Sequence, residues 1–307
     1  MTAVPKQWTA AQIKEDVEAS ADAFRKQRFS EPLEAWLREV DRRSAEFQLL
    51  FDAHDVAKPH NLTAADIPAI IEQGLLDALR YLPGPPISAD DLKNLAEIKS
   101  LSAKSLRQDP DAAQRLLDVI RATVDPRRFP WLTEDREPTP DERRIAIFAS
   151  ALMHAAPRTL MARRTLSKTD QEQAVREELS VHSLHASHLR RVKTYAEFPP
   201  SGVYSENEVI FGPKKADVLA RLWDDRMLPI ECKVSNSAVN SFKRLNHETL
   251  SKNTAWIEAF GRFNVVPAAM LAGVYSPANV EAAQAAGLAI FWSHRITDLG
   301  SFVESTK

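Results

Sequence analysis

The sequence of 307 residues predicts an α/β fold of the mixed α+β kind, in which a mixed sheet flanked by helices follows an all-helical N-terminal region. Apolar residues recur at helical spacing in the first half, whereas short runs typical of strands occur in the second. The last two strands enclose a helix, which indicates a parallel crossover. A charged, proline-punctuated stretch at 125–144 separates the halves. We therefore expect a helical region at 1–140 and an α/β domain at 141–307.

Four helices are expected in the helical region, over residues 10–28, 31–55, 63–82 and about 110–124. Thr9 and Thr63 are candidate N-caps of the first and third helices. The third helix ends before the rigid Pro-Gly-Pro-Pro of residues 83–86. The second helix places five apolar residues along one stripe, namely Leu33, Leu37, Val40, Phe47 and Leu50.

The α/β domain is expected to have the order α-β-β-β-α-β and to end in a β-α-β crossover. The elements are a helix near 169–187, a strand at 203–211, a hairpin at 217–234, a helix from about Ala238 to Phe260, a strand within 265–276, a helix at 277–287 and a strand at 288–294. The strand within 265–276 is mostly apolar, which is typical of a buried strand.

The most informative segment is the hairpin around Glu231-Cys232-Lys233. Residues 223–226 supply the turn, and residues 227–234 form the second arm. A turn centred near residue 224 would place Asp217 and Glu231 opposite each other, with Cβ atoms about 5 Å apart. Lys233, two residues further along, would join the same face. Two carboxylates and an ammonium would then meet at one point.

These groups match the needs of metal-dependent phosphodiester hydrolysis. Mg²⁺ binds one or two carboxylates and keeps several waters, and the expected ligands are Asp217, Glu231 and the backbone carbonyl of Cys232. Lys233 would orient the attacking water or stabilise the transition state. The Cys232 side chain is expected to point into the core as a structural residue. The alternative is a set of cross-strand ion pairs on a solvated face.

The tripeptide pattern alone is weak, because Glu97-Ile98-Lys99 matches it as well. That second copy lies in a segment expected to be helical, where residues two apart do not share a face. The hairpin and the preceding Asp217 therefore carry the prediction.

A polar, basic helix face follows the hairpin and consists of Asn236, Asn240, Lys243, Arg244 and His247. Asparagine, lysine and arginine contact base edges and phosphates. We expect this face to bind DNA, and a solvated helix face is the alternative.

Charged residues upstream of the hairpin offer further candidates. Glu172 is a candidate to assist the metal site, directly or through water, and Glu177 and Glu178 compete for that role. An ordinary surface acid is the alternative for each. Candidate phosphate contacts are Arg163, Arg164, Arg190, Arg191 and Lys193.

Composition limits the class of protein. The formal net charge of −2 means that a local basic surface, not the global field, must bind any nucleic acid. The single cysteine, Cys232, excludes an intrachain disulfide and suits a reducing cytoplasm. The first residues lack an apolar signal core, and no run approaches the roughly 18 apolar residues of a membrane span. We expect a soluble cytoplasmic protein.

Asp217 and Glu231-Cys232-Lys233, in this order of elements, resemble the PD-(D/E)xK nuclease superfamily. Residues 165–295 look like the XamI group of type II restriction endonucleases, and the resemblance implies Mg²⁺-dependent hydrolysis that leaves 5′-phosphate and 3′-hydroxyl ends. It gives Asp217 and Glu231 the metal-ligand roles and Lys233 the catalytic role. Ala216 stands where the pattern has a proline.

The same resemblance suggests a palindromic double-stranded DNA site such as GTCGAC. A palindrome matches a homodimer with one active site per strand. The implied partner is a cognate DNA methyltransferase that acts on the same site without being a stable subunit. Two alternatives stay open: a structure-selective or repair nuclease with this core, and a non-catalytic DNA-binding or scaffold protein that kept the fold.

Overall fold

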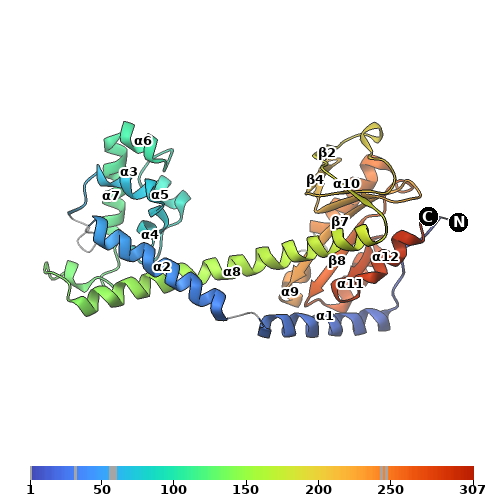
Figure 1. The fold of residues 1–307 in the computed structure, drawn as a ribbon, viewed down its shortest axis with the longest axis horizontal. Helices are drawn as coiled ribbons and strands as arrows, with labels where there is room; N and C mark the ends of the chain where they lie inside the picture. Colours follow the sequence, from blue (N-terminus) through green and yellow to red (C-terminus); the bar gives the residue numbers. More distant parts are fainter. Residues whose placement is uncertain (1, 31–32, 55–60, 243–244, 246–247) are drawn as a thin grey trace. The chain divides into compact units, whose positions relative to one another are not determined.

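The computed structural model describes the chain except for residues 1, 31–32, 55–60, 243–244 and 246–247. Only the backbone is described at Ser30, Arg164, Thr165, Leu166, Asn240 and Phe242. The chain divides into two compact units. Unit 1 comprises Met1–Glu31 and Arg163–Lys307, and unit 2 comprises Pro32–Ala162 (Figure 1).

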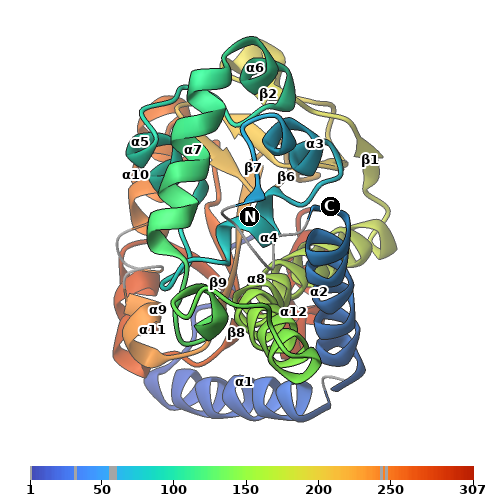
Figure 2. The same cartoon turned by 90° about the vertical axis from the view of Figure 1, so that its left-hand side faces the viewer.

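Unit 2 is helical, as predicted. Its helices are α2 (Leu33–His54), α3 (Asp66–Glu72), α4 (Leu76–Arg80), α5 (Ala89–Leu95), α6 (Ala103–Gln108), α7 (Pro110–Thr123), the 3₁₀ helix at Pro130–Leu132 and the first part of α8 (Pro140–Val181) (Figure 2). Asp109 caps α7 by accepting a hydrogen bond from the Ala112 N–H, and α7 buries Leu116 and Leu117. These leucines join Phe47 and Trp131 in one continuous apolar core.

Three details of unit 2 differ from the sequence prediction. The helix expected over 63–82 is divided into α3 and α4, because Gly74 adopts a φ of +75° and ends α3. In α2 the expected stripe is incomplete, since Leu33 and Leu37 are exposed. Glu97-Ile98-Lys99 follows α5 in a turn in which Glu97 has a φ of +54°, so this segment is not helical.

Unit 1 contains a six-stranded mixed sheet in the order β1-β3-β6-β7-β8-β9. The strands are β1 (His185–Ser187), β3 (Val203–Ser205), β6 (Val218–Arg221), β7 (Met227–Ser235), β8 (Ala268–Gly273) and β9 (Ala289–Trp292). β6 pairs antiparallel with β3 and β7, whereas β7, β8 and β9 are parallel. β8, α11 (Pro277–Ala285) and β9 form the predicted crossover. The fold class is confirmed.

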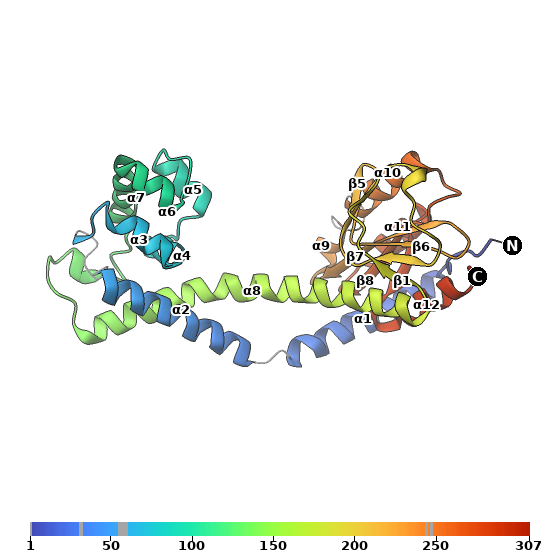
Figure 3. The ribbon, with the colours of Figure 1, turned by 45° about the horizontal axis from the view of Figure 1, so that its top comes forward.

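A second, three-stranded sheet has the order β2-β4-β5. Its strands are β2 (Arg191–Val192), β4 (Val209–Phe211) and β5 (Lys214–Ala216). Phe211 of β4 stacks on Phe260 of α10 (Leu250–Phe260) with ring centroids 4.4 Å apart, so α10 covers one face of this sheet (Figure 3).

Helices cover both faces of the larger sheet. Val175 and Leu179 of α8 and Phe302 of α12 (Thr297–Glu304) pack on one face with Ile230 and Cys232 of β7. On the opposite face, α1 (Ala10–Ser30) and α11 pack against alternate residues of β8 and β9, which are Ala269, Leu271, Ile290 and Trp292. This alternation follows the two-residue period of a strand.

The predicted boundary at residue 140 needs correction, because α1 belongs to unit 1 and not to the helical unit. The Trp8 indole N–H donates to the Ile290 carbonyl over 2.9 Å, and the Ser20 hydroxyl donates to the Gly273 carbonyl over 2.9 Å. These bonds attach α1 and the segment before it to β9 and to the end of β8. The helix α8 begins at Pro140 and extends across the boundary between Ala162 and Arg163, so it contributes residues to both units.

Other elements of unit 1 also differ from the prediction. The strand expected at 203–211 is two strands, β3 and β4, which belong to different sheets. The helix expected from Ala238 to Phe260 consists of α9 (Ala238–Phe242) and α10, with π-helical residues among the described positions between them. The described part of unit 1 also contains the 3₁₀ helices Tyr195–Glu197 and Ser293–Arg295.

Among the residues that the structure describes, one helix, α8, has a segment long and apolar enough to cross a membrane by length and composition. Its longest stretch without a charged residue is 145–157, between Arg144 and Arg158. Ala146, Ile147 and Ala151 of α8 pack into the core of unit 2, and helices that pack into protein cores meet the same criterion.

Candidate active site

The predicted hairpin register is observed. β6 and β7 pair Val218 with Ile230 and Ala220 with Leu228, with the turn at residues 223–226. One residue beyond the first pair, Asp217 stands opposite Glu231, as the symmetry of the hairpin predicts. Asp217 is the single residue between β5 of the small sheet and β6 of the large sheet.

The Asp217 side chain is buried, at 2% exposure, and held from two directions. Its Oδ2 accepts a hydrogen bond from the Cys232 backbone N–H over 2.8 Å, and its Oδ1 is 3.0 Å from Lys168 Nζ. The backbone carbonyl of Asp217 accepts a hydrogen bond of 3.2 Å from Arg176 on α8. The carboxylate is thus fixed at the end of β6, against the β7 backbone.

The Glu231 side chain is fully buried and contacts two lysines. Lys233 Nζ is 2.7 Å from Oε2, and Lys252 Nζ is 2.6 Å from Oε1. Burial raises the pKa of Glu231 above its usual value, Lys233 opposes this rise, and repulsion from Asp217 adds to it. The two lysines stabilise a carboxylate that would be costly to bury alone.

Cys232 points away from this charged group. Its side chain packs with Ile230 and Met270 in the core on the α8 side of the sheet. Burial, and to a smaller extent the charge of Asp217, hold the pKa of the Cys232 thiol well above its usual value. The thiol is therefore not activated as a nucleophile.

The three acids on α8 have different surroundings. Lys168 contacts Glu172 over 3.3 Å as well as Asp217, so Glu172 lies beside the proposed site. Glu177 accepts a hydrogen bond from Gln173, and Glu178 lies 3.3 Å from His182. Burial lowers the pKa of Lys168, but the charges of Asp217 and Glu172 outweigh it and raise this pKa above its usual value.

Sequence reasoning missed three cationic residues of this cluster, namely Lys168, Arg176 and Lys252. Lys168, Glu172 and Arg176 are spaced by four residues, so the helical period around Glu172 could have revealed the first two. Lys252 gave no such signal, because its approach to Glu231 depends on how α10 packs.

The ion pairs of the cluster are not on a solvated face. Asp217 and Glu231 are 2% and 0% exposed, which separates them from surface pairs such as Lys215 and Glu208. Buried pairs carry a desolvation cost that surface pairs avoid. The cluster therefore differs from the alternative interpretation, a set of cross-strand ion pairs on a solvated face.

The oxygen donors suit Mg²⁺, which binds one or two carboxylates and retains waters. Within the described residues, no group of three or more His, Cys, Asp or Glu side chains is arranged to hold a metal ion. Asp217 and Glu231 are two hard oxygen donors in a buried setting, and Mg²⁺ requires no more from the protein. The residues present therefore fit this ion in donor type.

Most of the predicted DNA-binding face lies outside the described residues. Lys243, Arg244 and His247 are among the positions that the structure does not describe, and at Asn240 only the backbone is described, within α9. Asn236 is exposed directly after β7.

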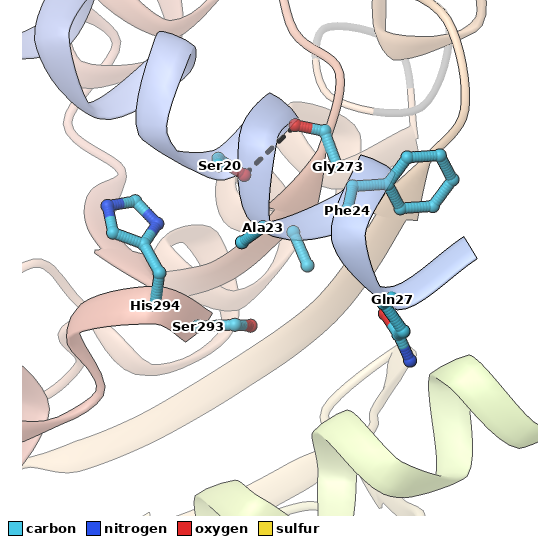
Figure 4. Close-up of a pocket in the computed structure, with 8 residues that line it drawn as sticks. Ser20, Ala23, Phe24, Gln27, Gly273, Ser293 and His294 are labelled. Atoms are coloured by element: carbon cyan, nitrogen blue, oxygen red, sulfur yellow. Dashed lines mark hydrogen bonds between the residues drawn. The ribbon is translucent and has the colours of Figure 1, made fainter. Parts of the chain in front are cut away.

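A pocket of about 190 Å³ lies between α1 and the ends of β8 and β9 (Figure 4). Its lining residues are Ser20, Ala23, Phe24, Gln27, Ala272, Gly273, Ser293 and His294. Gly273 pairs with Ser235, two residues after Lys233, so the pocket adjoins the same end of the sheet as the charged cluster.

Comparisons with known proteins found one family model and one curated relative. The family model described as XamI restriction endonuclease matches residues 60–292. The Type II restriction enzyme XamI of Xanthomonas campestris pv. amaranthicola is 36% identical over 271 residues, which cover 88% of this chain and 98% of that protein. No solved structure gives a significant match.

Proposed function

Because the chain belongs to the XamI restriction endonuclease family, we propose that it hydrolyses double-stranded DNA at a short palindrome with the help of Mg²⁺. The observation that carries the proposal is the buried cluster of Asp217, Glu231 and Lys233 at the β6–β7 hairpin. The family resemblance suggests GTCGAC as the site, and 5′-phosphate and 3′-hydroxyl ends as products.

Each residue of the cluster has a proposed role. Asp217 and Glu231, with the backbone carbonyl of Cys232, would hold the metal ion, and Glu172 would assist beside Asp217. The ion would supply charge neutralisation at the scissile phosphate and lower the pKa of water. Lys233 would orient the attacking water or stabilise charge on the phosphate. The Cys232 N–H fixes the orientation of Asp217.

The remaining proposals concern DNA and partners. Asn236, Asn240, Lys243, Arg244 and His247 would contact the DNA. A homodimer would place one active site on each strand of a palindrome. A cognate methyltransferase would modify the same site as a separate protein, and cleavage of foreign DNA would take place in the cytoplasm.

Plasmid cleavage tests the proposal. Wild-type protein with Mg²⁺ should give discrete fragments, whereas Asp217→Ala and Lys233→Ala should cut about a hundredfold to a thousandfold more slowly, as expected when catalytic electrostatics are removed. Lys307→Met removes an exposed lysine paired with Glu304 and should cut like wild type.

The pattern of cutting separates the alternatives. Cutting of intact duplex at one sequence supports a restriction enzyme, whereas cutting only at junctions or lesions indicates a repair nuclease. DNA binding without cutting, with any divalent ion, would show a scaffold.

A further inference from the structure

A second lysine reaches Glu231 from a separate helix. Lys252 belongs to α10 and places its Nζ 2.6 Å from Oε1, while Lys233 of β7 holds Oε2 at 2.7 Å. The Lys252 side chain is 23% exposed, so its ammonium lies between the buried carboxylate and solvent.

All four carboxylate oxygens of Asp217 and Glu231 have a donor from the protein. Oδ1 of Asp217 contacts Lys168 and Oδ2 accepts from the Cys232 N–H, while the two oxygens of Glu231 contact Lys252 and Lys233. A cation that binds these acids must therefore share an oxygen with one of these donors or replace it.

Lys252 is the contact best suited to be replaced at Glu231. An ammonium and a divalent cation on the same oxygen repel each other, and the repulsion is strong where little water screens it. Lys233 is the more enclosed of the two lysines, because its side chain is 14% exposed against 23% for Lys252. Its backbone pairs with Leu271 of β8, and its carbonyl accepts a hydrogen bond of 2.7 Å from the Tyr275 hydroxyl. Lys252 instead has a flexible stem that leads to solvent.

The helix that carries Lys252 is itself fixed. Trp256 and Phe260, one and two turns further along α10, are buried, and Asn253 donates to the Ala286 carbonyl over 3.2 Å. A released Lys252 ammonium would therefore remain near the site, where the scissile phosphate of bound DNA would be its nearest new anion.

We propose that Lys252 is a positioning residue that competes with the divalent cation for Glu231 Oε1 in the free enzyme and pairs with a DNA phosphate once the cation is bound. The inference rests on the proposed metal-binding role of Glu231. The competition makes cation binding weak before DNA arrives, and it couples cation binding and DNA binding reciprocally.

Calorimetric titration of the full chain with Mn²⁺ in the absence of DNA tests the proposed competition for Glu231. Lys252→Met should bind Mn²⁺ about tenfold more tightly than wild type, a factor typical of such coupling. Lys252→Arg keeps the charge and should bind like wild type, as should Lys307→Met. Lys252→Gln replaces the Met variant if that variant does not fold, as judged by circular dichroism.

The Glu231→Gln variant distinguishes failure of the proposed competition from failure of the proposed metal site. If it weakens Mn²⁺ binding and neutral Lys252 variants do not tighten it, the competition is refuted while the metal site stands. If Glu231→Gln leaves Mn²⁺ binding unchanged, the proposed metal site fails, and the inference with it.

Plasmid cleavage at saturating Mg²⁺ tests the second part. Lys252→Met should raise the KM for DNA about tenfold, because a charge-assisted phosphate contact is lost. An unchanged KM would refute the phosphate contact.

Discussion

The core of unit 2 contains a histidine whose titration should set the acid stability of that unit. His154 is fully buried, stacks on Tyr81 with ring centroids 4.3 Å apart and packs edge-on against Phe47. Neither ring nitrogen has a hydrogen-bond partner among the described residues. Burial, with the nearby charges of Arg43 and Arg158, lowers the pKa of His154 to about 4.

A depressed histidine pKa makes folding less favourable in acid. As the pH falls below about 6.5, the unfolded chain binds a proton that folded unit 2 does not bind until about pH 4. The shift corresponds to about 3 kcal/mol of unfolding free energy in full, of which roughly 2 kcal/mol is lost between pH 7 and pH 5.

The test compares wild type with His154→Leu, which keeps a side chain of similar volume without the titrating group. Urea unfolding at several pH values, with hydrogen exchange in α7 as the probe, gives the free energy of unfolding of unit 2 in each protein. The carboxylates titrate in both proteins, so the difference isolates His154. The stability of wild type relative to the variant should fall by roughly 2 kcal/mol from pH 7 to pH 5. Parallel pH profiles would refute the reasoning.

Two further predictions concern residues beside the candidate site. Gly273→Ala should lower the free energy of unfolding by about 3 kcal/mol or more in urea titrations, because a Cβ would lie 2.0 Å from the Ser235 carbonyl at a φ of +97°. Gly287→Ala, at a φ of +87° with nothing within 4 Å, should cost only about 1 kcal/mol, and equal losses would contradict the steric argument. Tyr275→Phe removes the hydroxyl that donates to the Lys233 carbonyl over 2.7 Å. It should cost about 1 kcal/mol of stability and slow plasmid cleavage several-fold at unchanged KM, and a change in KM alone would exclude this positioning role.

The local part of the site was predictable from sequence. Asp217 and Glu231 lie on either side of a short turn, so hairpin symmetry fixes their register without knowledge of the rest of the fold. Helix α7 was equally predictable, because its capping residue and apolar period are contained within one segment.

Long-range features were not predictable in this way. Trp8 bonds to Ile290, 282 residues away, and no local pattern shows that α1 packs on the sheet. Strands β1 and β2 have three and two residues, too few for a periodic signal. Lys252 reaches Glu231 only because α10 packs on the small sheet.

The single-residue link at Asp217 also has a mechanical consequence. Since β5 ends at Ala216 and β6 begins at Val218, a tilt of the small sheet is transmitted to the Asp217 backbone within one residue. Aligned, exposed residues cross the outer face of that sheet, namely Arg191, Ile210 and Lys215. Asp217 is therefore the residue through which the backbone joins the exposed outer face of the small sheet to the buried charged cluster.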